Sequence, residues 1–249
     1  MLKPLDKGAY MCINCGYSNN PTLVRVHGKD GREGKNPFKD DNCNPLSIRL
    51  STCEECDKPV DDSWTHDGCI LIINAILLKE SFFRHIISNC EKPASLSVKL
   101  FMVYSFCDTY QNWSRLTRKS GLEYSYVELE SLFYHMFFQA MVTNALFYSI
   151  ISLLFRNSFF RVGSYKFISS LILCSYSKFY KLPMTLWPSE LQALIDLFLQ
   201  FNLLWSLIEC CHVLNQNRSN RFNIGFRITF AFVITNVIMN VVSAFRPFR

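Results

Sequence analysis

Long apolar runs with short polar breaks make up most of the second half of the chain. The run at 132–155 is 24 residues without a formally charged side chain, and at about 1.5 Å per residue this length crosses a bilayer core of about 30 Å. Three further runs, at 162–182, 191–213 and 224–245, are of similar length. The pattern therefore predicts four membrane-spanning helices in residues 128–249.

Polar side chains inside these runs recur at helical spacing. Residues four apart lie on one face of a helix, and lipid penalises polar groups that face outward. These faces should therefore point into a helical bundle and line a groove that accepts an amphipathic lipid. The predicted groove residues are His135, Gln139, Asn202, Ser206, Asn236 and Asn240.

Residues 67–127 predict helices at the membrane surface instead of full spans. The apolar stretch 69–78 is ten residues long, which reaches only about halfway across the bilayer core. It continues into an amphipathic segment with Glu80, Arg84 and His85 on the polar side, as expected of a helix that lies in the interface. A buried helix of a soluble domain is the alternative interpretation.

The first 66 residues are polar and nearly neutral, with 9 Lys and Arg against 10 Asp and Glu. Residues 128–249 hold 10 basic against 5 acidic residues, so the formal charge of +6 lies mainly between the apolar runs. Cations in that position indicate contact with phospholipid headgroups. A nucleic-acid-binding module would carry a basic face of its own, so the charge pattern argues against nucleic acid as a partner.

Two close cysteine pairs mark the N-terminal part. Cys12 and Cys15 are separated from Cys53 and Cys56 by 37 residues. Four thiolates from two Cys-x-x-Cys turns can bind one zinc ion tetrahedrally, and Gly16 suits such a turn because it tolerates positive φ. The alternatives are two disulfides or unligated core thiols. The first residues lack the apolar core of a signal peptide and the eleven cysteines are an odd number, so the pattern favours a reduced, cytosolic zinc module.

Between the two pairs, residues 21–44 are rich in Gly, Pro, Lys, Asp and Asn and predict an exposed loop. The alternation at 48–51 predicts a short strand that enters the second pair. The predicted fold is a small zinc-ribbon-like β module, residues 1–66, followed by an α-helical polytopic membrane domain with about four spans plus interfacial helices. An even number of spans would place the zinc module and the C-terminal residues on the same, cytosolic side.

Four short motifs occur in a specific order across residues 11–89: Cys-Ile-x-Cys-Gly, Ile-Arg-Leu-Ser-x-Cys-x-x-Cys, Val-Asp, and Phe-Arg-His-Ile-Ile-x-Asn. This order resembles the Arv family of endoplasmic-reticulum membrane proteins, and a shorter similarity covers residues 173–187. The resemblance implies a zinc-binding domain before several spans, and a role in sterol and sphingolipid homeostasis and in glycosylphosphatidylinositol-anchor assembly. The chain departs from the family pattern in its long spacer, and at Asn74 and Leu78, where Asp and His are common.

The sequence features favour a non-enzymatic lipid-handling membrane protein with zinc as cofactor, and the resemblance implies the endoplasmic-reticulum membrane and a sterol, sphingolipid or glycosylphosphatidylinositol precursor as ligand. The alternative is an adaptor whose zinc module recruits a glycolipid-assembly enzyme while the spans anchor it. The sequence contains no phosphate loop, nucleophile elbow or paired-histidine motif. A membrane-embedded enzyme would have to use His135 with Asp196 or Glu209 as an acid–base pair, and is the least favoured of the three.

Overall fold

The chain forms two units, Met1–Glu91 and Lys92–Arg249, each of which is described by itself. The computed structural model describes residues 10–18, 24–27, 33–34, 47–90, 94–120, 126–186, 191–215 and 220–244. The first unit extends beyond residue 66, the predicted end of the zinc module. It does so because side chains from 84 and 89 hydrogen-bond to the backbone of residues 11–14.

The first unit contains a three-stranded antiparallel sheet with the strand order β2-β1-β3. β1 (Val24–His27) pairs with β2 (Glu33–Gly34) on one side and with β3 (Ser47–Leu50) on the other. β3 lies where a strand was predicted. β1 and β2 fall inside the stretch predicted as a loop, and that prediction was wrong for these residues. The alternating valines of β1 favour a strand despite the surrounding Gly and Pro.

The helix predicted at 67–89 is divided into α1 (Gly68–Ile76), α2 (Glu80–Arg84) and the single π-helical turn η2 (His85–Asn89). α1 ends because Leu78 adopts a left-handed conformation, with φ 54°. The Lys79 N–H donates to the Asn74 carbonyl and the Leu78 N–H to the Ala75 carbonyl, both at 3.0 Å. These are the two bonds of a Schellman motif, which satisfies carbonyls at a helix end. α2 therefore starts in a new direction.

The second unit is helical throughout its described residues. Its elements are α3 (Ala94–Ser120), α4 (Tyr126–Leu154), α5 (Arg156–Val162), α6 (Ser164–Cys174), the 3-10 helix η3 (Tyr176–Tyr180), α7 (Lys181–Leu186), α8 (Gln192–Leu214) and α9 (Arg221–Ala244). α3 is one continuous helix of 27 residues, where only short surface helices were predicted.

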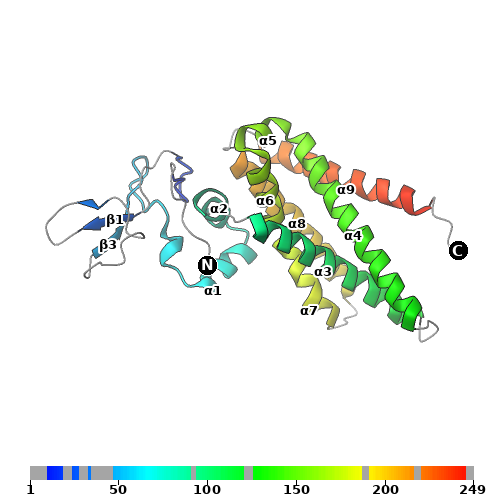
Figure 1. The fold of residues 1–249 in the computed structure, drawn as a ribbon. Coiled ribbons are helices and arrows are strands. Elements are labelled where there is room, and N and C mark those ends of the chain that lie inside the picture. The colour runs from blue at the N-terminus through cyan, green and yellow to red at the C-terminus, as the bar shows by residue number, and fades with distance from the viewer. Residues whose placement is uncertain are drawn as a thin grey trace. The chain divides into compact units, whose positions relative to one another are not determined.

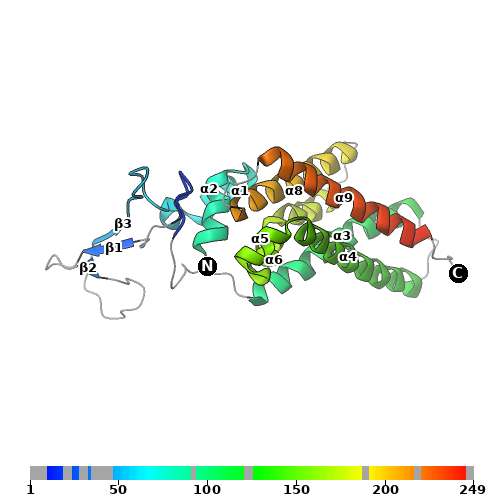
Figure 2. The same ribbon diagram turned by 90° about the horizontal axis from the view of Figure 1, so that it is seen from above.

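These helices close into a ring. α3 packs along α4, α4 packs against α9, and α9 packs against α8. α8 contacts α6 and η3, and both of these contact α3, which closes the ring. Figures 1 and 2 both show α3 and α4 running side by side. Fully buried apolar side chains that include Ile151, Leu171, Leu207 and Ile228 form the core of the ring.

Three helices of the described chain are long and apolar enough to cross a membrane: Val127–Leu154, Gln192–Leu214 and Arg221–Val241. They match three of the four predicted spans. The fourth prediction, 162–182, is wrong for a physical reason: α6 has 11 residues, about 16 Å, and the chain then bends so that Lys178 reaches Asp108. With that span removed, the even count that placed both ends on one side no longer holds.

Candidate metal centre and helical cavity

The four predicted zinc ligands converge on one point. The Sγ atoms of Cys12, Cys15, Cys53 and Cys56 all lie within 4.8 Å of one another. The Cys12 and Cys56 sulfurs are 3.7 Å apart and the Cys15 and Cys53 sulfurs 3.6 Å apart. A tetrahedral zinc ion with Zn–S bonds of about 2.3 Å separates its sulfurs by about 3.8 Å. All four are free thiols, so the donor set and its spacing fit zinc and not two disulfides.

Both cysteine pairs sit in turns of the same construction. The Gly16 N–H donates to the Cys12 carbonyl at 2.9 Å, and the Asp57 N–H donates to the Cys53 carbonyl at 3.0 Å. The residue after each second cysteine has a positive φ, 83° at Gly16 and 54° at Asp57. Glycine takes this conformation freely and Asp takes it more readily than most residues. Sequence reasoning found the role of Gly16 but missed Asp57.

The protein environment gives the metal-free thiols unequal acidities. Burial raises the pKa of Cys12 to about 12, and burial likewise raises the pKa of Cys15. At Cys53 burial acts in the same direction, but hydrogen bonds from the backbone N–H groups of Glu55 and Cys56 and from the Cys15 and Cys12 side chains together outweigh it and lower the pKa to about 7. Zinc binds thiolates, so Cys53 is the thiol closest to its binding form, whereas Cys12 must release its proton to the solvent when the ion binds.

A buried polar network ties the second cysteine turn to the π turn. Asp61 is fully buried; its Oδ2 lies 2.7 Å from His85 Nδ1 and accepts from Asn89 Nδ2 at 2.6 Å, while its Oδ1 accepts from the Ser63 N–H. Because a carboxylate only accepts, His85 carries its proton on Nδ1. His85 Nε2 then faces the Cys90 thiol at 3.4 Å. We call Asp61, His85 and Asn89 the clamp.

The same helical segment also holds the first cysteine turn. Asn89 accepts from the Met11 N–H and donates to the Met11 carbonyl, both at 2.9 Å. Arg84 Nη1 donates to the Ile13 and Asn14 carbonyls, and its Nη2 pairs with Glu80. The Arg-His-Ile-Ile-x-Asn motif therefore fastens both turns to one helical segment.

The polar side predicted for the interfacial helix is largely buried in the structure. Arg84 and His85 are buried within the first unit, and Phe82, Phe83 and Ile87 are buried with them. The exposed apolar side chains belong instead to α1 and its end: Ile70, Ile72, Ile73, Ile76 and Leu77.

A cavity of about 440 Å³ lies inside the ring of the second unit. α3, α4, η3, α7, α8 and α9 all contribute to its wall. Part of the wall is apolar and the rest is polar or charged; the apolar residues are Met136, Ala140, Phe147, Leu199, Leu203 and Phe232. Small-molecule sites in proteins span about 300–1,000 Å³ and combine these two kinds of surface.

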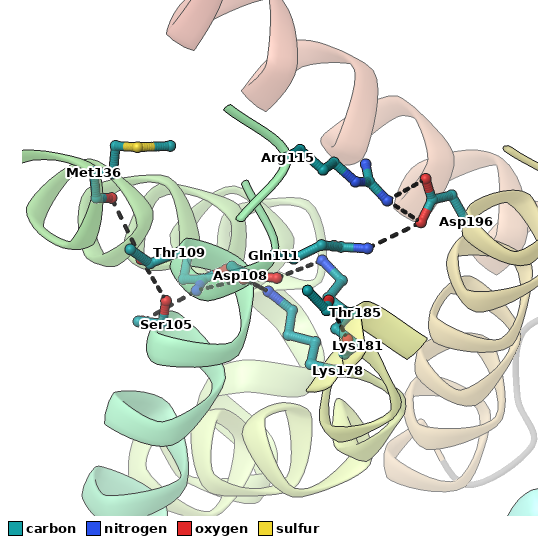
Figure 3. A network of polar contacts seen from close by, with 11 residues as sticks. Ser105, Asp108, Thr109, Gln111, Arg115, Met136, Lys178, Lys181, Thr185 and Asp196 are labelled. Atoms are coloured by element: carbon teal, nitrogen blue, oxygen red, sulfur yellow. Dashed lines mark hydrogen bonds and ion pairs between the residues drawn. The ribbon is translucent and has the colours of Figure 1, made fainter. Parts of the chain in front are cut away.

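One cluster of charges in this wall centres on Asp108 of α3 (Figure 3). Lys178 Nζ donates to Asp108 Oδ2 at 2.7 Å and also to Asn144 Oδ1. Lys181 binds the other carboxylate oxygen. Lys178 is only 6% exposed, so the carboxylate compensates a cation that is almost wholly removed from water.

A second cluster centres on Asp196 in the first turns of α8. Arg115 Nη2 donates to both carboxylate oxygens, and Gln111 donates to Oδ1 at 2.9 Å (Figure 3). The other acid considered for catalysis, Glu209, faces Arg221 at 3.5 Å, and His135 is exposed on α4. Both carboxylates of the enzyme alternative are thus paired with arginines.

The structure brings two of the six predicted groove residues, Gln139 and Asn236, to the cavity wall. Asn202 and Ser206 are buried in α8, where Ser206 donates to the Cys174 carbonyl at 2.8 Å. Asn240, like His135, is exposed. Sequence reasoning missed Asp108, Asn144 and Lys178 as a group. The sequence did contain a signal for this group: Asp108 and Lys178 are charged residues within otherwise apolar stretches, and buried opposite charges tend to pair.

Comparison with known proteins identifies the family of the chain. Residues 11–211 match the Arv1-like family. Protein ARV1 of Bos taurus is 27% identical over 86% of this chain and 72% of its own length, and Protein ARV1 of Homo sapiens is 24% identical over 95% and 81%. Protein ARV1 of Candida albicans is 33% identical over 79 residues. No solved structure matches. Because the match covers most of the chain, including both cysteine pairs and the clamp, the chain belongs to the Arv1-like family.

Proposed function

We propose that this chain is a non-enzymatic membrane protein of lipid homeostasis in the endoplasmic reticulum. It takes part in the transport or distribution of sterols and sphingolipids and supports glycosylphosphatidylinositol-anchor biosynthesis. Zinc, held by the four cysteines, is its structural cofactor. Membership of the Arv1-like family and the three candidate spans support this proposal.

The cavity in the helical ring is the observation that carries the proposal. Three of the elements around it, α4, α8 and α9, contain the candidate spans, so a lipid within the bilayer has apolar helices beside it. Polar and charged side chains on α3, η3 and α7 make part of the wall hydrophilic. An amphipathic molecule has the two kinds of surface that this wall offers.

Photo-crosslinking of the purified full-length protein with sterol, ceramide and glycosylphosphatidylinositol-precursor probes tests lipid binding. Ala140 lines the cavity, whereas Ala145, on the same helix, is exposed. We expect saturable labelling of cavity residues that Ala140→Phe abolishes and Ala145→Phe retains. Labelling that rises with the lipid mole fraction without saturation, and that ignores Ala140→Phe, would overturn the proposal.

The orientation is a separate part of the proposal: the zinc module faces the cytosol. Free thiols at metal-binding distance are typical of a reducing compartment. Protease digestion of a tag before residue 1 in intact microsomes tests it. A tag that is cleaved only after the vesicles are permeabilised places the module in the lumen.

The exposed apolar side chains of α1 favour a second candidate function, an adaptor for a glycolipid-assembly enzyme complex. Patches of this kind mark interaction sites. In that case the full-length Ile72→Ser/Ile73→Ser variant loses the partner enzyme in co-purification but keeps saturable lipid labelling. The adaptor idea fails if the enzyme still co-purifies with this variant and is lost from Ala140→Phe.

A further inference from the structure

Ser177 is a buried polar residue of the described cavity wall whose hydroxyl forms no hydrogen bond. It is 1% exposed and lines the cavity, and in the described part of the chain its Oγ has no hydrogen-bond partner. Nearby serines differ: Ser175 Oγ accepts from Tyr148 and donates to the Leu171 carbonyl, and Ser170 Oγ donates to the Lys166 carbonyl. Buried hydroxyls are nearly always paired, so this one indicates a missing partner in the cavity.

Unused cationic donors line the same cavity. Lys181 binds Asp108, and an ammonium carries three N–H groups. Arg115 uses Nη2 for Asp196, and its guanidinium has further N–H groups on Nη1 and Nε. The described wall therefore presents Lys181, Arg115 and the Ser177 hydroxyl to the cavity.

The charge of the wall indicates what these donors would bind. Arg115, Lys178 and Lys181 are three cations, and Asp108 and Asp196 are the two carboxylates that pair with them. A phosphate ester supplies the negative charge that is in deficit and several acceptor oxygens for charged donors. A sterol offers one hydroxyl and no charge, so it leaves the surplus cation uncompensated.

We propose that the cavity holds the phosphate-bearing headgroup of a membrane lipid, with Ser177, Lys181 and Arg115 as its ligands. This inference rests on the proposed function, because it names the class of lipid that the cavity takes. The apolar wall at Phe147, Leu199 and Phe232 then contacts the part of the lipid next to the headgroup. Lys178 has a different task, since it is already held by Asp108 and Asn144.

The test is labelling of the full-length protein in a phosphate-free maltoside detergent with photoactivatable phosphatidylinositol, ceramide and sterol. The variants are Ser177→Ala and Lys181→Gln, with Lys181→Arg as the conservative change. Ser170→Ala and Lys166→Gln are matched controls, because Ser170 is paired with the backbone and Lys166 is exposed outside the cavity wall. Thermal unfolding of each variant confirms that it is folded.

We expect saturable labelling by phosphatidylinositol, with an apparent Kd that rises about tenfold in Ser177→Ala and in Lys181→Gln. The matched controls and Lys181→Arg should stay within about twofold of the parent. If ceramide or sterol labels the cavity saturably and folded Ser177→Ala and Lys181→Gln label as the parent does, the phosphate site is overturned while lipid binding stands.

Two further arms identify the source of the phosphate and separate this inference from the proposed function. Inorganic phosphate and inositol phosphate are added as competitors. Competition by millimolar inorganic phosphate at the strength of unlabelled phosphatidylinositol would overturn the lipid as its source. No saturable labelling by any of the three probes, in a protein that is folded, overturns the proposed function itself.

Discussion

The carboxylate of Asp61 lies 2.7 Å from Nδ1 of His85, and both side chains are almost completely buried. These two residues belong to different parts of the sequence pattern: one follows the second cysteine pair, and the other opens the π turn. Their contact makes the metal centre and the helical segment one folding unit. Asn89 extends the contact to the first cysteine pair through Met11.

We predict that Asp61→Ala destabilises the first unit by about 3–5 kcal/mol, which is the range for removing one partner of a buried charged pair. The substitution leaves the Ser63 N–H and the amide of Asn89 without their acceptor. Hydrogen exchange of the backbone N–H groups of the cysteine turns, compared between parent and variant, measures the effect. Asp62→Asn is the control, since Asp62 is half-exposed beside it; equal protection in all three proteins would contradict the prediction.

Cys53→Ser should reduce the zinc content from one ion per chain to near zero. Loss of one of four thiolates removes a ligand of a tetrahedral site, and structural zinc contributes directly to folding. Elemental analysis and limited proteolysis of residues 1–91 within the full-length protein check the two effects. Cys69→Ser, at an exposed cysteine of α1, should retain zinc and protease resistance.

The two cysteine turns should respond unequally to substitution of the residue with positive φ. Gly16→Ala places a Cβ in the left-handed region and should destabilise the first unit by about 1–2 kcal/mol. Asp57→Gly removes a similar strain from the other turn, but glycine adds freedom to the unfolded chain, so the net change should lie within about 0.5 kcal/mol of zero. Thermal unfolding of the zinc-loaded protein compares them. Equal destabilisation by both changes would contradict the positive-φ argument.

Zinc affinity should fall as the pH falls. The pKa of Cys12 is raised to about 12 and that of Cys15 is also raised, so near pH 7.5 both are protonated in the metal-free protein and must release protons to bind zinc. Protons and zinc therefore compete for the same sulfurs, and a lower pH favours release of the ion. Calorimetry of zinc binding in buffers of different ionisation enthalpy measures the protons released. Zinc uptake without proton release would contradict the raised pKa values.

Asp108→Leu should destabilise the helical unit by about 3–5 kcal/mol, because it leaves Lys178 buried without a counter-charge. The double variant Asp108→Leu/Lys178→Met removes both charges and should recover a large part of that loss. Thermal unfolding in detergent gives both values. Strictly additive destabilisation by the two substitutions would show that the ion pair is not coupled.

Prediction from the sequence succeeded where the signal is local. Cys12 and Cys15 lie within one turn, so their spacing alone indicates a shared ion, and the uncharged run 132–155 indicates α4 by its length. It failed where the decisive partner is distant in the chain. Lys178 and Asp108 are 70 residues apart, and nothing in the sequence near Lys178 indicates that the two side chains pair. The clamp was missed for the same reason, because nothing in the sequence around Asp61 indicates that its carboxylate contacts a π turn 24 residues later.

The hydrogen bonds between Met11 and Asn89 also order events during synthesis. Their partners are separated by 78 residues, and contacts of such long range form only when both ends are available. During translation the cysteine turns emerge first, but they cannot be fastened until residue 89 has left the ribosome. Residues 94–120 of α3 follow immediately. The metal-binding unit can therefore be completed only when synthesis of the chain has reached the first helix of the second unit.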